Sequence, residues 1–178
     1  QLAADLLRQV RPSASVSLES AFEAAWPLNP LVTLLLGPVS KRSYGQNQRS
    51  IFSFLGSSEQ MAFRDYLENT LAEDAATYTL SKFWDYLEYN LHSSIAVSLD
   101  SHHFTNARDA IARCQSQGGS DLQIDLLKSV ALLELTQKQT GLGATKKALA
   151  LANNITVKKA GAEIAKLEKQ SILVFKKF

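Results

Sequence analysis

The segment "GQNQRSIFSFL" at residues 45–55 places one arginine among amide side chains, directly before an apolar run. An arginine fork can bind a carboxylate or a phosphate group. Asn47 can cap a short helix that carries Arg49 and the apolar residues after it. The pattern therefore has two interpretations: Arg49 contacts a charged group, or it simply occupies the start of a helix.

Charge is unevenly distributed between the two ends of the chain. Residues 1–120 hold 9 Lys and Arg against 12 Asp and Glu, a net charge of −3. Residues 121–178 hold 10 against 5, a net charge of +5. A basic region of this kind binds nucleic acid or an acidic protein surface, or is a solvated lysine-rich helix face.

The lysines of one predicted helix, over 157–170, carry much of this charge. We expect four of them to face outward and to contact nucleic acid or a protein partner: Lys158, Lys159, Lys166 and Lys169. Base recognition favours Arg, Asn, Gln and Ser on such a face. The first turns offer instead Ala160, Gly161, Ala162 and Glu163, and these small residues favour close packing against a protein.

No catalytic or metal-binding motif in the chain is complete. The glycines of "TGLGATKK" lack the spacing of a P-loop and follow no strand. The adjacent His102 and His103 point to different sides of a helix or strand, so they do not readily share one metal ion. Cys114 lies in the helical pattern "DAIARCQSQ", which favours a small buried residue over a nucleophile. We expect no catalytic residue and no metal ligand.

The composition is that of a globular protein. The 178 residues are 46% apolar and 20% charged, enough for one domain or two small ones. No apolar run approaches the roughly 20 residues that span a bilayer. The single cysteine excludes an internal disulfide and favours a reducing compartment, so we expect a cytoplasmic protein without membrane contact. A first residue of Gln rather than Met suggests a fragment or a processed chain.

Apolar residues recur at helical spacing along most of the chain. Helices are predicted over 2–11, 17–26, 77–96, 102–117, 120–137 and 156–170, with a short one within 140–154 after Gly141 and Gly143. After Pro30 we expect an apolar turn or short helix that breaks at Gly37-Pro38. Another helix restarts at Ser57 or Ser58, with an apolar stripe of Met61, Phe63, Tyr66, Leu67 and Leu71.

The last sixty residues follow the order helix, short helix, helix, strand. Ser120 and Thr156 are the expected caps of the two longer helices. The segment "SILVFKKF" at 171–178 is rich in β-branched and aromatic residues, which favours a strand. This is the order of a winged-helix module in which the strand begins the wing.

Part of the chain resembles the region after the P-loop core of large bacterial AAA+ and STAND-type ATP-binding proteins, some associated with defence against phage. The resemblance covers residues 28–178. It is carried first by "LNPLVTLLLGPVSKRSYGQNQRSIFSFLGSSE", with Pro30, Gln46, Asn47, Arg49, Ser50, Phe52, Phe54 and Leu55. The segments "LLKSVALLELT" and "EIAKLEKQSILVFKKF" are similar to the winged-helix part of the same proteins.

The predicted elements and the resemblance together indicate a mainly α fold in two parts. Residues 1–119 would form a helical, bundle-like lid domain, and residues 120–178 a winged-helix-like domain truncated in its short β wing. Arg49, with Gln46 and Asn47, would contact the nucleotide, and Lys41 and Arg42 are weaker candidates. The alternative is an arginine that pairs with a carboxylate or a helix end within the lid.

The function implied is that of a non-catalytic coupling fragment. It would link the nucleotide state of an upstream ATPase core, which binds ATP and Mg²⁺, to movement of the winged helix. The fragment itself would hold no cofactor. Two other functions stay open: a DNA-binding winged-helix regulator, and a stand-alone helical adaptor for protein interaction.

Overall fold

The structure is a computed structural model that describes residues 2–10, 18–42, 44, 49–71 and 76–173. The described residues are mainly helical, which confirms the mainly α class. The ten helices in the described residues are α1 (Leu2–Val10), α2 (Leu18–Ala24), α3 (Pro30–Ser40), α4 (Arg49–Gly56), α5 (Phe63–Asn69), α6 (Leu80–Ala96), α7 (Ser101–Ser116), α8 (Asp121–Thr140), α9 (Lys146–Ala152) and α10 (Val157–Lys169). None of them is long and apolar enough to cross a membrane.

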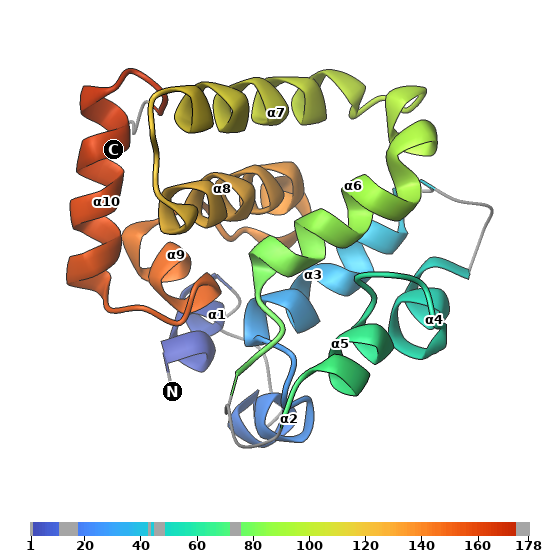
Figure 1. Cartoon of the computed structure of the whole chain (residues 1–178). Coiled ribbons are helices and arrows are strands. Elements are labelled where there is room, and N and C mark those ends of the chain that lie inside the picture. The colour runs from blue at the N-terminus through green and yellow to red at the C-terminus, as the bar shows by residue number, and fades with distance from the viewer. Residues whose placement is uncertain (1, 11–17, 43, 45–48, 72–75, 174–178) are drawn as a thin grey trace.

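Helix α8 is the central element of the structure. It begins at the expected cap, Ser120, whose side chain accepts a hydrogen bond from the Gln123 N–H group. The Gln123 side-chain oxygen accepts from the Ser120 N–H group in turn, which completes a capping box. It ends at Gly141, whose φ of 75° lies in the left-handed region that glycine tolerates. Along its length α8 packs against α3, α6, α7, α9 and α10 (Figure 1).

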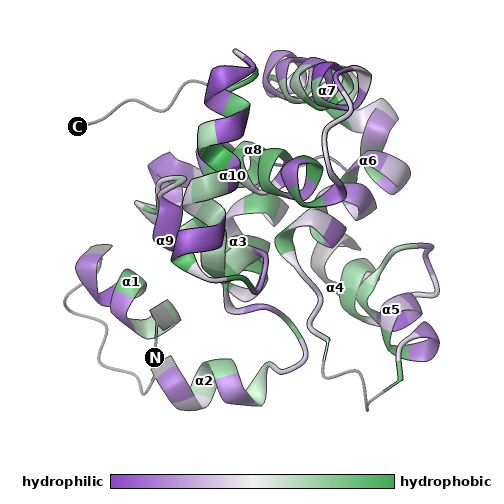
Figure 2. Ribbon diagram, turned by 60° about the vertical axis from the view of Figure 1, so that its left-hand side comes forward, coloured by the Kyte–Doolittle hydropathy of each residue, from purple (hydrophilic) through white to green (hydrophobic). Residues whose placement is uncertain are grey.

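The buried side chains form one large apolar cluster that extends from Leu6 to Ile164. It therefore includes residues on both sides of the predicted boundary at 119–120, because α8 contributes to the packing of α6 and of α9 alike. The division into two domains stays a prediction. Figure 2 shows the apolar colouring concentrated on α3 and α8, with hydrophilic residues along the outer sides of α7 and α10.

The predicted break at Gly37-Pro38 is wrong, because α3 continues through it to Ser40. Pro38 has no N–H group to bond the Leu34 carbonyl, which weakens the last turn. Burial of one face of the helix offsets this cost, through Leu31, Val32, Leu35 and Val39. Tertiary packing therefore outweighs the local helix-breaking signal.

The predicted stripe over 61–71 is only partly buried. Helix α5 begins at Phe63 rather than at Ser57 or Ser58, after Met61 with a φ of 66°. The Asp65 carboxylate accepts the Met61 N–H group at 2.8 Å and fixes this turn. Tyr66 is buried, but the side chains of Met61, Leu67 and Leu71 are exposed.

Helix α10 ends in a compact turn where a strand was predicted. Ser171 has a φ of 55°, and the Ile172 N–H group donates to the Leu167 carbonyl at 3.0 Å, which is a Schellman ending. Ile172 is buried with Cys114 and Leu127 in a small second cluster. Residues 171–173 are not part of a strand, and 174–178 lie outside the described residues, so the β wing stays a prediction.

Candidate functional site

The α9–α10 helix pair is fixed by local capping and by its inner apolar face. Thr145 and Thr156 cap the two helices, each accepting a backbone N–H bond at 3.2 Å, and the Thr156 cap confirms the sequence prediction. The inner face of α10 buries Ala160, Ile164 and Leu167. The opposite face of α10 is therefore presented to solvent.

This outward face of α10 is basic. At 3.6 residues per turn, Lys158, Ala162, Ala165 and Lys169 form one row along the helix, and all four are exposed. Lys159 and Lys166 lie beside this row and are also exposed. The four lysines that the sequence predicted to face outward thus share one side of α10.

Neighbouring acidic groups neutralise little of this charge. Lys166 Nζ contacts Glu163 Oε1 at 2.8 Å, and the other Glu163 oxygen accepts from the Gln123 amide at 3.1 Å. Within the described residues, Lys158, Lys159 and Lys169 form no ion pair. Residues 141–170 contain six lysines and two glutamates, a net charge of +4.

Helix α9 adds a fifth lysine, which the sequence analysis missed. Lys146 lies along α10 at Gly161, where a Cβ atom on residue 161 would be 3.6 Å from Lys146 Cδ. This is an ordinary van der Waals distance, so the stem of Lys146 packs beside Gly161. We call Lys146, Lys158, Lys159, Lys166 and Lys169 the lysine surface. The lysine pair at the start of α9 was the available signal, but only the packing places Lys146 beside α10.

A buried asparagine ties the α9–α10 turn to the rest of the structure. Asn29 is fully buried; its Nδ2 donates to the Leu151 carbonyl at 2.8 Å and to Asn154 Oδ1 at 3.3 Å. Asn154, with a φ of 53°, donates in turn to Thr77 Oγ1 at 2.6 Å. Because Asn29 also caps α3 through the Leu31 N–H group, the turn between α9 and α10 is fixed to the start of α3.

Arg49, the predicted nucleotide contact, is the first residue of α4, where its backbone but not its side chain is described. Gln46 and Asn47 lie outside the described residues. Five residues after Arg49, Phe54 is buried against Phe83 and Tyr86, with ring centroids 5.0 Å away in each case. Helix α4 is thereby seated on the core.

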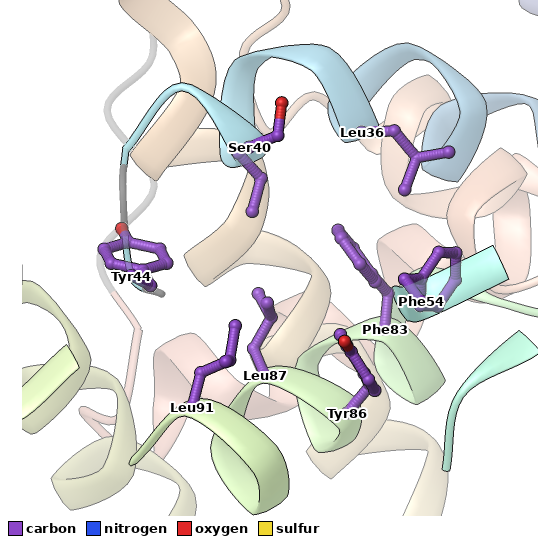
Figure 3. A pocket seen from close by; sticks show the side chains of 9 residues that line it. Leu36, Ser40, Tyr44, Phe54, Phe83, Tyr86, Leu87 and Leu91 are labelled. Atoms are coloured by element: carbon purple, nitrogen blue, oxygen red, sulfur yellow. The ribbon is translucent and has the colours of Figure 1, made fainter. Parts of the chain in front are cut away.

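A small apolar cleft lies beside Phe54 (Figure 3). Its volume is about 20 Å³, close to that of one water molecule, and α3, α4 and α6 supply most of its lining. Its polar groups are already engaged, since Ser40 Oγ donates to the Gly37 carbonyl and Tyr86 Oη to Glu59. The cleft is too small and too apolar for a nucleotide.

Arg42, a weaker candidate for contacting the nucleotide, already forms hydrogen bonds with other groups of the chain. Its Nη1 donates to Asp100 Oδ1 at 2.6 Å, and its Nη2 donates to the Leu135 carbonyl and to Gln139. Tyr44 Oη donates to the other Asp100 oxygen at 2.5 Å. Burial alone would raise the pKa of Asp100, but the hydrogen bonds from Arg42 and Tyr44 and the Arg42 charge lower that pKa below its usual value. We call Arg42, Tyr44 and Asp100 the Asp100 cluster.

The histidines and the cysteine do not converge. His92 lies near Glu88 at 3.7 Å, His102 contacts Asn106, and His103 contacts the Ala131 carbonyl at 2.8 Å. Cys114 is buried, and burial raises the pKa of its thiol. Among the residues that the structure describes, no three His, Cys, Asp or Glu side chains are placed to hold a metal ion.

Comparisons with models of protein families, with curated proteins and with solved structures gave no match for this chain.

Proposed function

We propose that the chain is a non-catalytic helical binding module whose lysine surface holds the phosphate backbone of a nucleic acid. The observation that supports this proposal most directly is that α9 and α10 together present five exposed lysines. Two of them end a row along α10 whose other members are Ala162 and Ala165. Lysine contacts phosphate as a mobile point charge, and such phosphate contacts carry no base specificity. In this proposal α8, α9 and α10 are the three helices of a winged-helix-like unit.

The charge distribution favours nucleic acid over a protein partner. Lysine is depleted from the buried centre of protein interfaces, because its ammonium group is costly to desolvate. With Lys146 on one side of the alanine row and Lys159 and Lys166 on the other, a protein partner would have to cover lysines from both helices. A phosphate backbone needs no such desolvation, since lysine meets it at the wet surface.

The proposal predicts sequence-independent and salt-sensitive binding to duplex DNA. With five contacts, the slope of log affinity against log salt is expected to be about −4.5. Replacing Lys158 and Lys169 with glutamine should weaken binding about tenfold at low salt and reduce the slope by about 2. Fluorescence anisotropy with two duplexes of unrelated sequence, between about 50 and 200 mM salt, measures both quantities.

A matched variant controls for net charge. Lys41 and Lys138 are exposed lysines at the ends of α3 and α8, and replacing both with glutamine removes the same two charges. Binding by this control should stay within about twofold of the original chain, given screening by salt. Equal losses for the two variants, or tight binding to a polyglutamate chain but not to DNA, would contradict the proposal.

We also propose that the chain couples nucleotide state in an upstream ATPase core to the lysine surface. Support comes from the resemblance and from one observation: Arg49 opens α4, and Phe54 of α4 is packed into the apolar cluster that extends through α8 to Ile164 of α10. A packed connection of this kind can carry coupling between distant sites when it has two discrete arrangements. ATP and Mg²⁺ would be held by the ATPase core.

Arg49 gives the test of this coupling in the full-length protein. Replacing it with alanine is expected to slow ATP hydrolysis at least tenfold, with a smaller effect on ATP binding, because an arginine of this kind stabilises charge that develops on the transferred phosphate. Replacement with lysine should restore part of the rate. Arg64, an exposed arginine on α5, is the matched control. If the Arg49 and Arg64 variants hydrolyse ATP equally well, Arg49 has no role in nucleotide chemistry.

A further inference from the structure

Helix α2 presents an unusual face to the rest of the chain. Glu19, Phe22, Glu23 and Trp26 follow one another at spacings of three, one and three residues, so they lie on one side of the helix and its extension. A core-facing helix would place aliphatic residues at these positions. Here the face carries two aromatic rings and two carboxylates.

These four side chains line a hollow of about 530 Å³. The other lining residues are mainly apolar. Leu28 and Pro30 follow Trp26 closely in the sequence, whereas Ala3, Thr77 and Leu151 come from distant parts of the chain. The Trp26 side chain is 56% exposed, so most of its indole is open to solvent. A volume of several hundred Å³ is typical of sites for small organic ligands. We call this cavity the α2 hollow.

The charge of the α2 hollow is negative. Among the residues that the structure describes, its lining contains Glu19 and Glu23 and no Lys or Arg. Glu19 is already paired: Arg8 Nη2 contacts its two carboxylate oxygens at 2.8 and 3.0 Å. Its backbone hydrogen bond, and then the bond from Arg8, lower the pKa of Glu19 below its usual value. Within the described residues Glu23 forms no ion pair, although it lies one turn from that pair on the same face.

We propose that the α2 hollow binds an organic cation, a guanidinium or primary ammonium group, between the Trp26 ring and the Glu23 carboxylate. An aromatic face attracts a cation through its quadrupole, and a nearby carboxylate adds charge complementarity. The Arg8–Glu19 pair shows that the same helix face already holds one guanidinium group. This site is separate from the lysine surface and does not depend on the proposed nucleic-acid binding.

The test uses ligands that differ in charge alone. Blocked argininamide and a blocked Gly-Arg-Gly peptide are the two probes, and the same compounds with neutral citrulline in place of arginine are the controls. Isothermal titration calorimetry with the whole chain gives the affinities. A change in tryptophan emission that is absent from the Trp26→Phe variant reports contact with Trp26, because the other tryptophan, Trp84, is buried. Equal affinity for the two arginine probes identifies a free small cation as the ligand, whereas tighter peptide binding identifies a basic side chain of a partner.

Substitutions assign the binding to the hollow. Glu23→Gln is expected to weaken arginine binding about threefold to fivefold, the loss of one partly exposed ion pair. Trp26→Leu should weaken it about threefold, while Trp26→Phe keeps an aromatic face and retains more of the affinity. Glu134→Gln, at an exposed carboxylate of α8, is the matched control and should bind as the original chain does. Helical circular dichroism verifies the fold of each variant.

Two results would overturn the proposal. One is equal binding of the arginine and citrulline probes, which would show that charge is not recognised. The other is equal affinity for the Glu23→Gln and Glu134→Gln variants, which would place any arginine binding elsewhere on the chain.

Discussion

Replacing Phe54 with alanine is expected to lower the free energy of unfolding by about 4 kcal/mol. The Phe54 side chain is 1% exposed, and its ring lies 5.0 Å from the rings of Phe83 and Tyr86 and 5.3 Å from that of Tyr78. Alanine would remove these contacts and leave a cavity in the aromatic part of the core. Urea denaturation followed by helical circular dichroism measures the loss.

The neighbouring residue supplies the control for this substitution. Leu55 is on the same helix but is 37% exposed, so Leu55→Ala should cost about 1 kcal/mol or less. A cost for Phe54→Ala no larger than that for Leu55→Ala would mean that α4 is not seated on the core. In that case the packed connection from Arg49 to α10 would also be lost.

Replacing Asp100 with alanine is expected to cost about 3 kcal/mol at neutral pH, because it leaves a largely buried guanidinium group without its counter-charge. The Arg42 side chain is 15% exposed and that of Asp100 is 22% exposed. Among the described residues, the buried Arg42 Nε has no hydrogen-bond partner, so the loss of Asp100 leaves the Leu135 carbonyl and Gln139 as the described acceptors for this guanidinium. Thermal or urea denaturation gives the difference.

The same cluster predicts a pH dependence of definite sign. The pKa of Asp100 is lowered in the folded state, so its stabilising contribution is fully present above the ordinary aspartate pKa of about 3.9. That contribution is lost as the pH falls through the lower, folded-state value. The stability difference between the original chain and Asp100→Asn should therefore shrink as the pH is lowered from about 5 toward 2.

The exposed Asp109 on the same helix α7 is the control for Asp100. Asp109→Asn should change stability by less than about 0.5 kcal/mol at any of these pH values. If the difference between the Asp100→Asn variant and the original chain is the same at pH 3 and at pH 7, the carboxylate does not titrate with the folding equilibrium, and the ion pair with Arg42 contributes nothing.

The elements that the sequence predicted well have their signals within a few residues. Helices α8 and α10 begin where Ser120 and Thr156 can accept a nearby backbone N–H group, so capping reveals their starts. The four outward lysines of α10 follow from helical periodicity in the same way. Local chemistry is visible in a sequence because both partners are close together in it.

The features that the sequence did not reveal depend on residues far apart. Helix α3 continues through Pro38 because one of its faces is buried in the core. Leu67 is exposed because no other element covers its side of α5 in the described residues. Lys146 joins the lysine surface only because α9 folds against Gly161. Asn29 can be recognised as a cap before Pro30, but its bonds to Leu151 and Asn154 span more than 120 positions.

The one thiol of the chain lies where α10 is attached to the rest of the protein. Cys114 is fully buried in the cluster that also holds Leu127, Leu167 and Ile172, so α7, α8 and the end of α10 cover it together. A thiol-reactive probe can reach the sulfur only when this junction opens. The rate of labelling at Cys114 therefore measures how often α10 separates from α7 and α8. It can be measured in the unaltered chain because no second cysteine contributes.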